Sequence, residues 1–121
     1  MPISVSWVKC GNGGGNWCPL ETLNLDSVGD VAGVYVIWHE GNPSRVVRVG
    51  QGNPIKGRLG AHRNDSGITL YNAYGTLRVT WASVPSNQRD GVERFLAETW
   101  HPLVGVAFPD ILPIAVNSPW S

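Results

Sequence analysis

Residues 33–62 have the sequence GVYVIWHEGNPSRVVRVGQGNPIKGRLGAH, and this stretch decides the fold. Residues 33–38 and 45–50 are rich in β-branched and aromatic side chains, which is typical of buried strands. The six residues between them, HEGNPS, have the composition of a turn. We therefore expect an antiparallel hairpin, followed by a glycine-rich turn and a short helix that ends near His62.

The register of this hairpin decides which polar side chains meet. With a six-residue loop, the simplest pairing places Trp38 opposite Arg45. The same register places Tyr35 opposite Arg48, so that a phenol and a guanidinium touch on one face of the sheet.

The helix that follows is expected to begin at Asn53 and Pro54, because asparagine caps helices and proline suits the first helical position. Arg58 and His62 are one helical turn apart, so their side chains lie on the same face of the helix. Two polar side chains that can contact an anion therefore follow directly after the hairpin.

The remaining segments complete one domain over residues 1–121. Residues 75–84 alternate apolar and polar side chains and predict a third strand, and residues 3–8 predict an extra N-terminal strand in the same way. Residues 86–100 have apolar side chains at helical spacing, with Ser86 as the expected cap. We expect an α/β (α+β) fold with a three-stranded, mainly antiparallel sheet flanked by helices, and an extended C-terminal tail.

Composition places the chain among small globular domains. Of 121 residues, 42% are apolar and 15% are charged. No apolar run reaches the roughly 18 residues of a membrane span, and the N-terminus lacks the apolar stretch of a signal peptide, so a cytoplasmic location is expected. Cys10 and Cys18, on either side of a glycine-rich turn, are then expected to be free thiols, with half of a zinc site as the less favoured alternative.

The formal net charge is zero, but the charges are unevenly distributed. Residues 45–94 contain eight basic and three acidic residues, a net charge of +5, and the flanking segments carry −5. A basic middle segment can present a positive face to phosphate groups even in a neutral protein.

Two short motifs in this order resemble those of the GIY-YIG nucleases. The sequence GVY at 33–35 resembles the first motif, and RVG at 48–50 stands in the place of the second, with Arg48 where the family has a tyrosine. Arg58 and His62 match the arginine that follows in the family and the histidine that some branches carry four residues later.

The resemblance extends over residues 31–105 and reaches the family's metal ligand. Glu93 stands nine residues before Pro102, the spacing of the metal-binding glutamate in the family. The asparagine that usually follows the proline is Gly105 here, and Asn117 in the tail is a candidate substitute. The resemblance implies an endonuclease that uses Mg²⁺ or Mn²⁺, bound by Glu93, to hydrolyse DNA.

The chemistry of these residue types supports the same activity. Cleaving a phosphodiester requires an activated water and neutralisation of the phosphoryl charge. Glu93 can hold one Mg²⁺ whose other ligands are water and phosphate, and Arg58 offers paired donors to phosphate. Tyr35 is the candidate general base, if Arg48 and a metal lower its pKa, and His62 is the candidate proton relay or phosphate ligand.

Each of these residues also has a purely structural explanation, such as strand packing or a surface charge. Tyr71 and Tyr74 are expected to pack within a polar loop at 64–75, with base stacking as the alternative. Two other functions stay open: a nucleic-acid-binding module that has lost cleavage, which Arg48 and Gly105 permit, and a protein-interaction or regulatory domain. Since there is no room for a second core, a nuclease of this size requires a homodimer, a partner protein or a branched DNA substrate for specificity.

Overall fold

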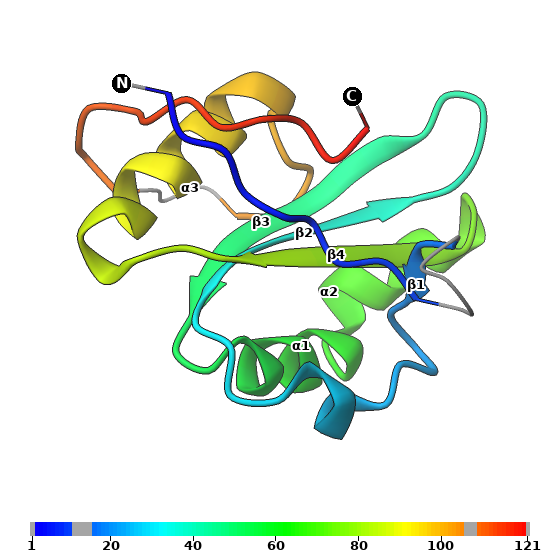
Figure 1. The fold of residues 1–121 in the computed structure, drawn as a ribbon. Helices are drawn as coiled ribbons and strands as arrows, with labels where there is room; N and C mark the ends of the chain where they lie inside the picture. The colour runs from blue at the N-terminus through cyan, green and yellow to red at the C-terminus, as the bar shows by residue number, and fades with distance from the viewer. Residues whose placement is uncertain (1, 11–15, 106–108, 121) are drawn as a thin grey trace.

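The computed structural model describes residues 2–10, 16–105 and 109–120 of a small α+β domain (Figure 1). The strands are β1 (Cys18–Pro19), β2 (Gly33–His39), β3 (Arg45–Gly52) and β4 (Leu77–Ser83). The helices are α1 (Ile55–Arg63), α2 (Ser66–Thr69) and α3 (Ser86–Trp100), and two 3₁₀ turns are η2 (Leu25–Val28) and η3 (Leu70–Ala73). The four strands form one antiparallel sheet in the order β1-β4-β2-β3.

Helices cover both faces of the sheet, with α1 and α2 on one side and α3 on the other (Figure 1). All seven residues of β2 are buried, which explains why its sequence is a continuous apolar run rather than an alternation. The core on the α1 face includes Tyr35, Ile37, Leu59 and Trp81. The core on the α3 face includes Val34, Val36, Val92 and Leu96.

The three main strands and the two longer helices lie within two residues of their predicted positions, but the predicted hairpin register is wrong. Tyr35 pairs with Gly50, and Arg48 pairs with Ile37. The strand β2 extends through His39, and a register irregularity between Ile37 and Trp38 adds one unpaired residue to β3. Because the register of β3 against β2 is shifted by two residues in total, Arg48 still lies on the same face of the sheet as Tyr35, but it is not directly opposite Tyr35.

The predicted N-terminal strand at 3–8 is also wrong. This segment alternates between half-buried and exposed residues as expected, but its described β-pairing is an isolated parallel bridge from Ile3 to Val116. Val8 donates to the Trp81 carbonyl of β4 at 3.0 Å without forming a strand. The extra strand of the sheet is β1, which pairs with β4. The sheet therefore has four strands rather than three.

The described part of the C-terminal tail, residues 109–120, is extended and crosses the α3 side as predicted (Figure 1). The Asn117 side chain pairs with both backbone groups of Val5, accepting from its N–H at 2.7 Å and donating to its carbonyl at 3.0 Å. Asn117 therefore joins the two ends of the chain, and its amide is already occupied there.

The free-thiol prediction is wrong, because Cys10 and Cys18 form a disulfide. The backbone of Cys10 pairs in both directions with Asn16, which brings the chain back beside β1 and leaves the two cysteine Cα atoms 5.0 Å apart. The disulfide also removes the zinc alternative, since the thiolates that bind zinc are absent. The glycine-rich turn expected at 11–15 lies outside the described residues.

The predicted helix caps and the predicted loop differ as well. Pro54 and Pro85 occupy the N-cap positions of α1 and α3, and neither helix has a side-chain cap. Both prolines have extended backbone conformations, so each helix begins one residue after its proline. The polar segment at 64–75 folds into α2 and η3, because the Asp65 carboxylate accepts from the backbone N–H of Gly67 at 2.8 Å.

In the part of the chain that the structure describes, no helix has the length and apolar character to cross a bilayer.

Candidate active site

The predicted site residues come from both faces of the sheet. Tyr35 and Arg48 lie on β2 and β3, Arg58 and His62 on α1, and Glu93 on α3. The charges of Arg48 and Arg58 act on the pKa of each of the other three side chains. The five side chains therefore share one electrostatic neighbourhood near the end of the edge strand β3, although the predicted register is wrong.

Tyr35 and His62 form the closest polar pair of this group. The Tyr35 hydroxyl lies 2.6 Å from His62 Nε2, and the Tyr35 side chain is only 1% exposed. Gly50 makes room for this phenol, because a Cβ atom at Gly50 would overlap the Tyr35 hydroxyl and ring. The glycine of the second motif therefore has a steric role in the site.

Arg48 acts to lower the pKa of Tyr35, as expected, but its effect alone does not bring that pKa below the ordinary value. Burial raises the pKa of Tyr35 and outweighs the opposing charges of Arg48 and Arg58. Burial, together with Arg48, lowers the pKa of His62. The phenol and the imidazole are therefore both neutral near pH 7, and in the tautomer protonated at Nδ1 the Tyr35 hydroxyl donates to His62.

Arg48 carries a buried donor that lacks a partner. Its Nε atom has no hydrogen bond to any described residue. An unpaired buried N–H costs free energy, and next to a positive charge it favours the arrival of an anion. Arg48 is thus a candidate contact for a phosphate oxygen or for a tyrosine that has lost its proton.

Glu93 is held by Gln51, a residue that the sequence pattern did not indicate. Gln51 Nε2 donates to Glu93 Oε1 at 2.8 Å and to Asp90 Oδ1 at 2.6 Å. Burial raises the pKa of Glu93, and the Asp90 charge adds to this, while the Gln51 hydrogen bond opposes it. The position of Asp90, three residues before Glu93 on one helix, is a signal in the sequence, whereas Gln51 requires knowledge of the strand register.

The carboxylate oxygens of Glu93 and Asp90 are the groups at this position that are available for a divalent cation. Carboxylate and amide oxygens are the ligands that Mg²⁺ prefers, with water and phosphate completing the set. The described residues contain no cluster of three or more His, Cys, Asp or Glu side chains that can hold a metal. Glu93 and Asp90 are the two carboxylates that a cation here would contact, and its charge would offset the repulsion between them.

An open hollow of about 840 Å³ lies beside these groups. Its lining includes Arg58 and Arg89 together with Gln51 and Asp90. Gly57 also lines the hollow, and a Cβ atom there would meet nothing within 4 Å. Positive side chains and carboxylate oxygens therefore border a space that is open to a large ligand.

The five predicted residues differ in their access to solvent. Arg58 is exposed, Arg48 and His62 are half-buried, and Tyr35 and Glu93 are buried. Of the five side chains, Arg58 is therefore the most accessible to a ligand.

The positive face is smaller than the count of basic residues suggests. Three of the eight form ion pairs, namely Arg78 with Glu40, Arg94 with Glu98 and Lys56 with Asp30. Arg63 and Arg89 donate to backbone carbonyls. Among the described contacts, the side chains of Arg45 and Arg58 have no hydrogen-bonded or ionic partner, and the Nε atom of Arg48 also lacks one. Arg48 and Arg58 belong to the candidate site.

Comparisons with protein-family models, with curated proteins and with solved structures found no match to this chain.

Proposed function

We propose that this chain is a divalent-metal-dependent endonuclease of the GIY-YIG type that hydrolyses DNA phosphodiester bonds. The observation that supports the proposal is the 2.6 Å contact between Tyr35 and His62, together with the charges of Arg48 and Arg58 that act on Tyr35, His62 and Glu93 from two strands and two helices.

Arg58 is the proposed first contact of the scissile phosphate. It is exposed, it lines the hollow, and no described contact neutralises it, so its paired donors are free for a phosphate. Arg48 is the proposed second contact, through the guanidinium whose Nε lacks a partner. A substrate phosphate would satisfy both cations.

The proposed metal ligand is Glu93, with Asp90 beside it. A Mg²⁺ held there would supply neutralisation of the charge that develops on the phosphate. Gln51 orients the Glu93 carboxylate through its 2.8 Å hydrogen bond, so the amide acts as a positioning group.

The proton steps follow from the neutral state of Tyr35 and His62. A neutral imidazole at pH 7 accepts a proton, and His62 already contacts the Tyr35 hydroxyl at 2.6 Å. We propose that Tyr35 takes a proton from the attacking water as it passes its own proton to His62. This relay needs no free phenolate in the resting protein, which burial disfavours.

A nucleic-acid-binding module without cleavage is the second candidate. The observation that favours it is the burial of Tyr35, since a base that is only 1% exposed must become accessible before it can act. Binding through Arg58 and Arg48 requires no such change.

A nicking assay separates the two candidates. Supercoiled plasmid and branched DNA are incubated with Mg²⁺ or Mn²⁺ and the wild type, Arg58→Ala or Glu93→Gln. The nuclease predicts a loss of about a hundredfold or more in both variants. Arg94→Ala is the matched control, because Arg94 lies on the same helix as Glu93 but pairs with Glu98 on the surface.

Nicking that survives both substitutions would contradict the proposed site, since a contaminating nuclease would explain it better. DNA binding that weakens steeply with salt, without nicking under any metal, would favour the binding module.

A further inference from the structure

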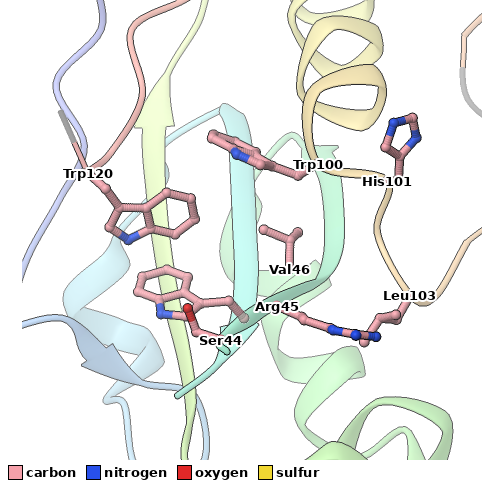
Figure 2. A pocket seen from close by; sticks show the side chains of 8 residues that line it. Ser44, Arg45, Val46, Trp100, His101, Leu103 and Trp120 are labelled. Atoms are coloured by element: carbon pink, nitrogen blue, oxygen red, sulfur yellow. The ribbon is translucent and has the colours of Figure 1, made fainter. Parts of the chain in front are cut away.

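The opposite end of β3 carries an aromatic surface that the proposed cleavage chemistry does not use. A pocket of about 490 Å³ lies there, lined by Trp38, Trp100 and Trp120 among others. Figure 2 shows Trp100 and Trp120 close together, with Val46 below Trp100 and the Arg45 side chain extending toward Leu103.

A second hollow adjoins this pocket. It has a volume of about 470 Å³ and is lined by His39, Tyr71 and Tyr74. Arg45 and Leu103 line both spaces. One arginine therefore stands between two groups of aromatic rings.

The rings offer open surface on both sides of Arg45. Trp120 packs edge-to-face on Trp38 and Trp100, with both ring centroids 5.0 Å away, and it stays 43% exposed. On the other side, Tyr74 lies 5.8 Å from Tyr71 and is 66% exposed. Large exposed rings at a protein surface are typical of binding sites for flat ligands.

The charges of this surface select an anionic ligand. Arg45 is exposed, and its side chain has no hydrogen bond or ion pair among the described residues. None of the residues lining either hollow is acidic. A cationic ligand would thus find no counter-charge here, whereas a ligand with flat rings joined by a negative group matches the surface.

We propose that these two hollows bind neighbouring bases of a single nucleic-acid strand, with the intervening phosphate on Arg45. Stacking on exposed aromatic rings requires unpaired bases, because the bases of a duplex already stack on one another. The ends of β3 are about 24 Å apart at roughly 3.4 Å per residue, so one strand can reach from this surface to the hollow near Arg58. The binding itself does not depend on cleavage. The role of this surface, which is to select DNA with a single-stranded arm, rests on the proposed function.

Binding without metal tests this inference independently of cleavage. Fluorescence anisotropy is measured with a labelled 12-nucleotide oligothymidine and with a 12-base-pair duplex, in the absence of divalent cations. The single strand is expected to bind more tightly than the duplex. Tyr74→Ala and Trp120→Ala are each expected to weaken its binding about fivefold to a hundredfold.

Arg45→Gln separates the charge from the rings. Removing one phosphate contact to a single strand should reduce the slope of log K against log salt by about 0.7. Leu112→Ala is the control, since Leu112 is exposed and lines neither hollow. Arg45 and Tyr74 are exposed, so their variants test the surface even if Trp120→Ala disturbs the tail.

Equal binding of duplex and single strand, or single-strand binding unchanged by both Tyr74→Ala and Arg45→Gln, would overturn the inference. Glu93→Gln should abolish nicking but keep the single-strand binding measured without metal, because Glu93 is proposed to act only through a metal. If the wild type binds a single strand but does not nick DNA, the proposed nuclease is refuted and this inference stands. If the wild type nicks DNA and the surface variants bind the single strand as well as the wild type does, this inference is refuted and the nuclease stands.

Discussion

Substitution of Gly50 by alanine tests the strand pairing on which the candidate site depends. In the structure, Gly50 lies opposite Tyr35, and a Cβ atom there would overlap the tyrosine hydroxyl and ring. The tyrosine cannot turn aside easily, because it is buried in the core on the α1 face. Gly50→Ala should therefore force strain on the pair of Tyr35 and His62.

The magnitude follows from two opposing effects. Overpacking in a buried site costs about 1–3 kcal/mol. Where there is no overlap, replacing a strand glycine by alanine stabilises by roughly 0.5–1 kcal/mol. In a Tyr35→Leu background, which removes the ring, Gly50→Ala should thus be neutral or stabilising, so the coupling between the two positions should exceed about 1 kcal/mol.

Urea unfolding of the wild type, both single variants and the double variant measures this coupling. The register expected from the sequence, with Arg48 opposite Tyr35, would place Gly50 opposite Gly33 and away from the ring. Equal effects of Gly50→Ala in the two backgrounds would refute the observed pairing and the steric role of Gly50.

Three further predictions concern stability, binding and the disulfide. Gly57→Ala should stabilise the protein by about 0.5–1 kcal/mol in thermal unfolding, because a Cβ atom there meets nothing and alanine favours the helix. Gly57→Glu should weaken DNA binding, because it places a negative charge in the hollow. Equal DNA affinities of Gly57→Glu and the wild type would contradict this. Since the pKa of His62 is lowered by folding, the unfolded chain binds a proton there first, and the wild type should lose stability as pH falls below about 6.5. The His62→Gln variant should lack this part of the loss. If the urea midpoints of the wild type and the variant fall by the same amount from pH 7.5 to 5.5, His62 does not contribute to the loss. Cys10→Ser with Cys18→Ser should cost about 2–3 kcal/mol of stability, and reduction of the wild type should give the same decrease in melting temperature; a melting temperature that reductant does not change would exclude the disulfide.

The elements of the fold could be predicted because each has a strong local pattern. Residues 33–38 are continuously apolar, which suits a strand covered on both faces, and β2 has this environment. The stripe of Val92 and Leu96 places α3 against the sheet, and both side chains are fully buried. The grouping of Arg58 and His62 on one helix follows from helical spacing alone.

The features that were not predicted depend on contacts between distant segments. The pairing of His39 with Arg45 and the irregularity between Ile37 and Trp38 each shift the hairpin by one residue, and no turn signal in the sequence indicates either. The roles of Gln51 and Asp90 depend on that register and on the docking of α3. The net direction of the Tyr35 pKa depends on its burial, which local sequence does not supply. The disulfide requires the return of the chain from Cys10 to β1, which spacing alone does not establish.

A crystal structure with Mn²⁺ and a short DNA that carries a non-hydrolysable linkage tests the central claim most directly. Anomalous scattering locates the metal, and the density locates the phosphate beside it. The proposed site predicts Mn²⁺ on the Glu93 carboxylate, sharing a phosphate oxygen, with Arg58 donating to the same phosphate. Ordered DNA whose phosphates contact neither Arg58 nor a metal at Glu93 would contradict it.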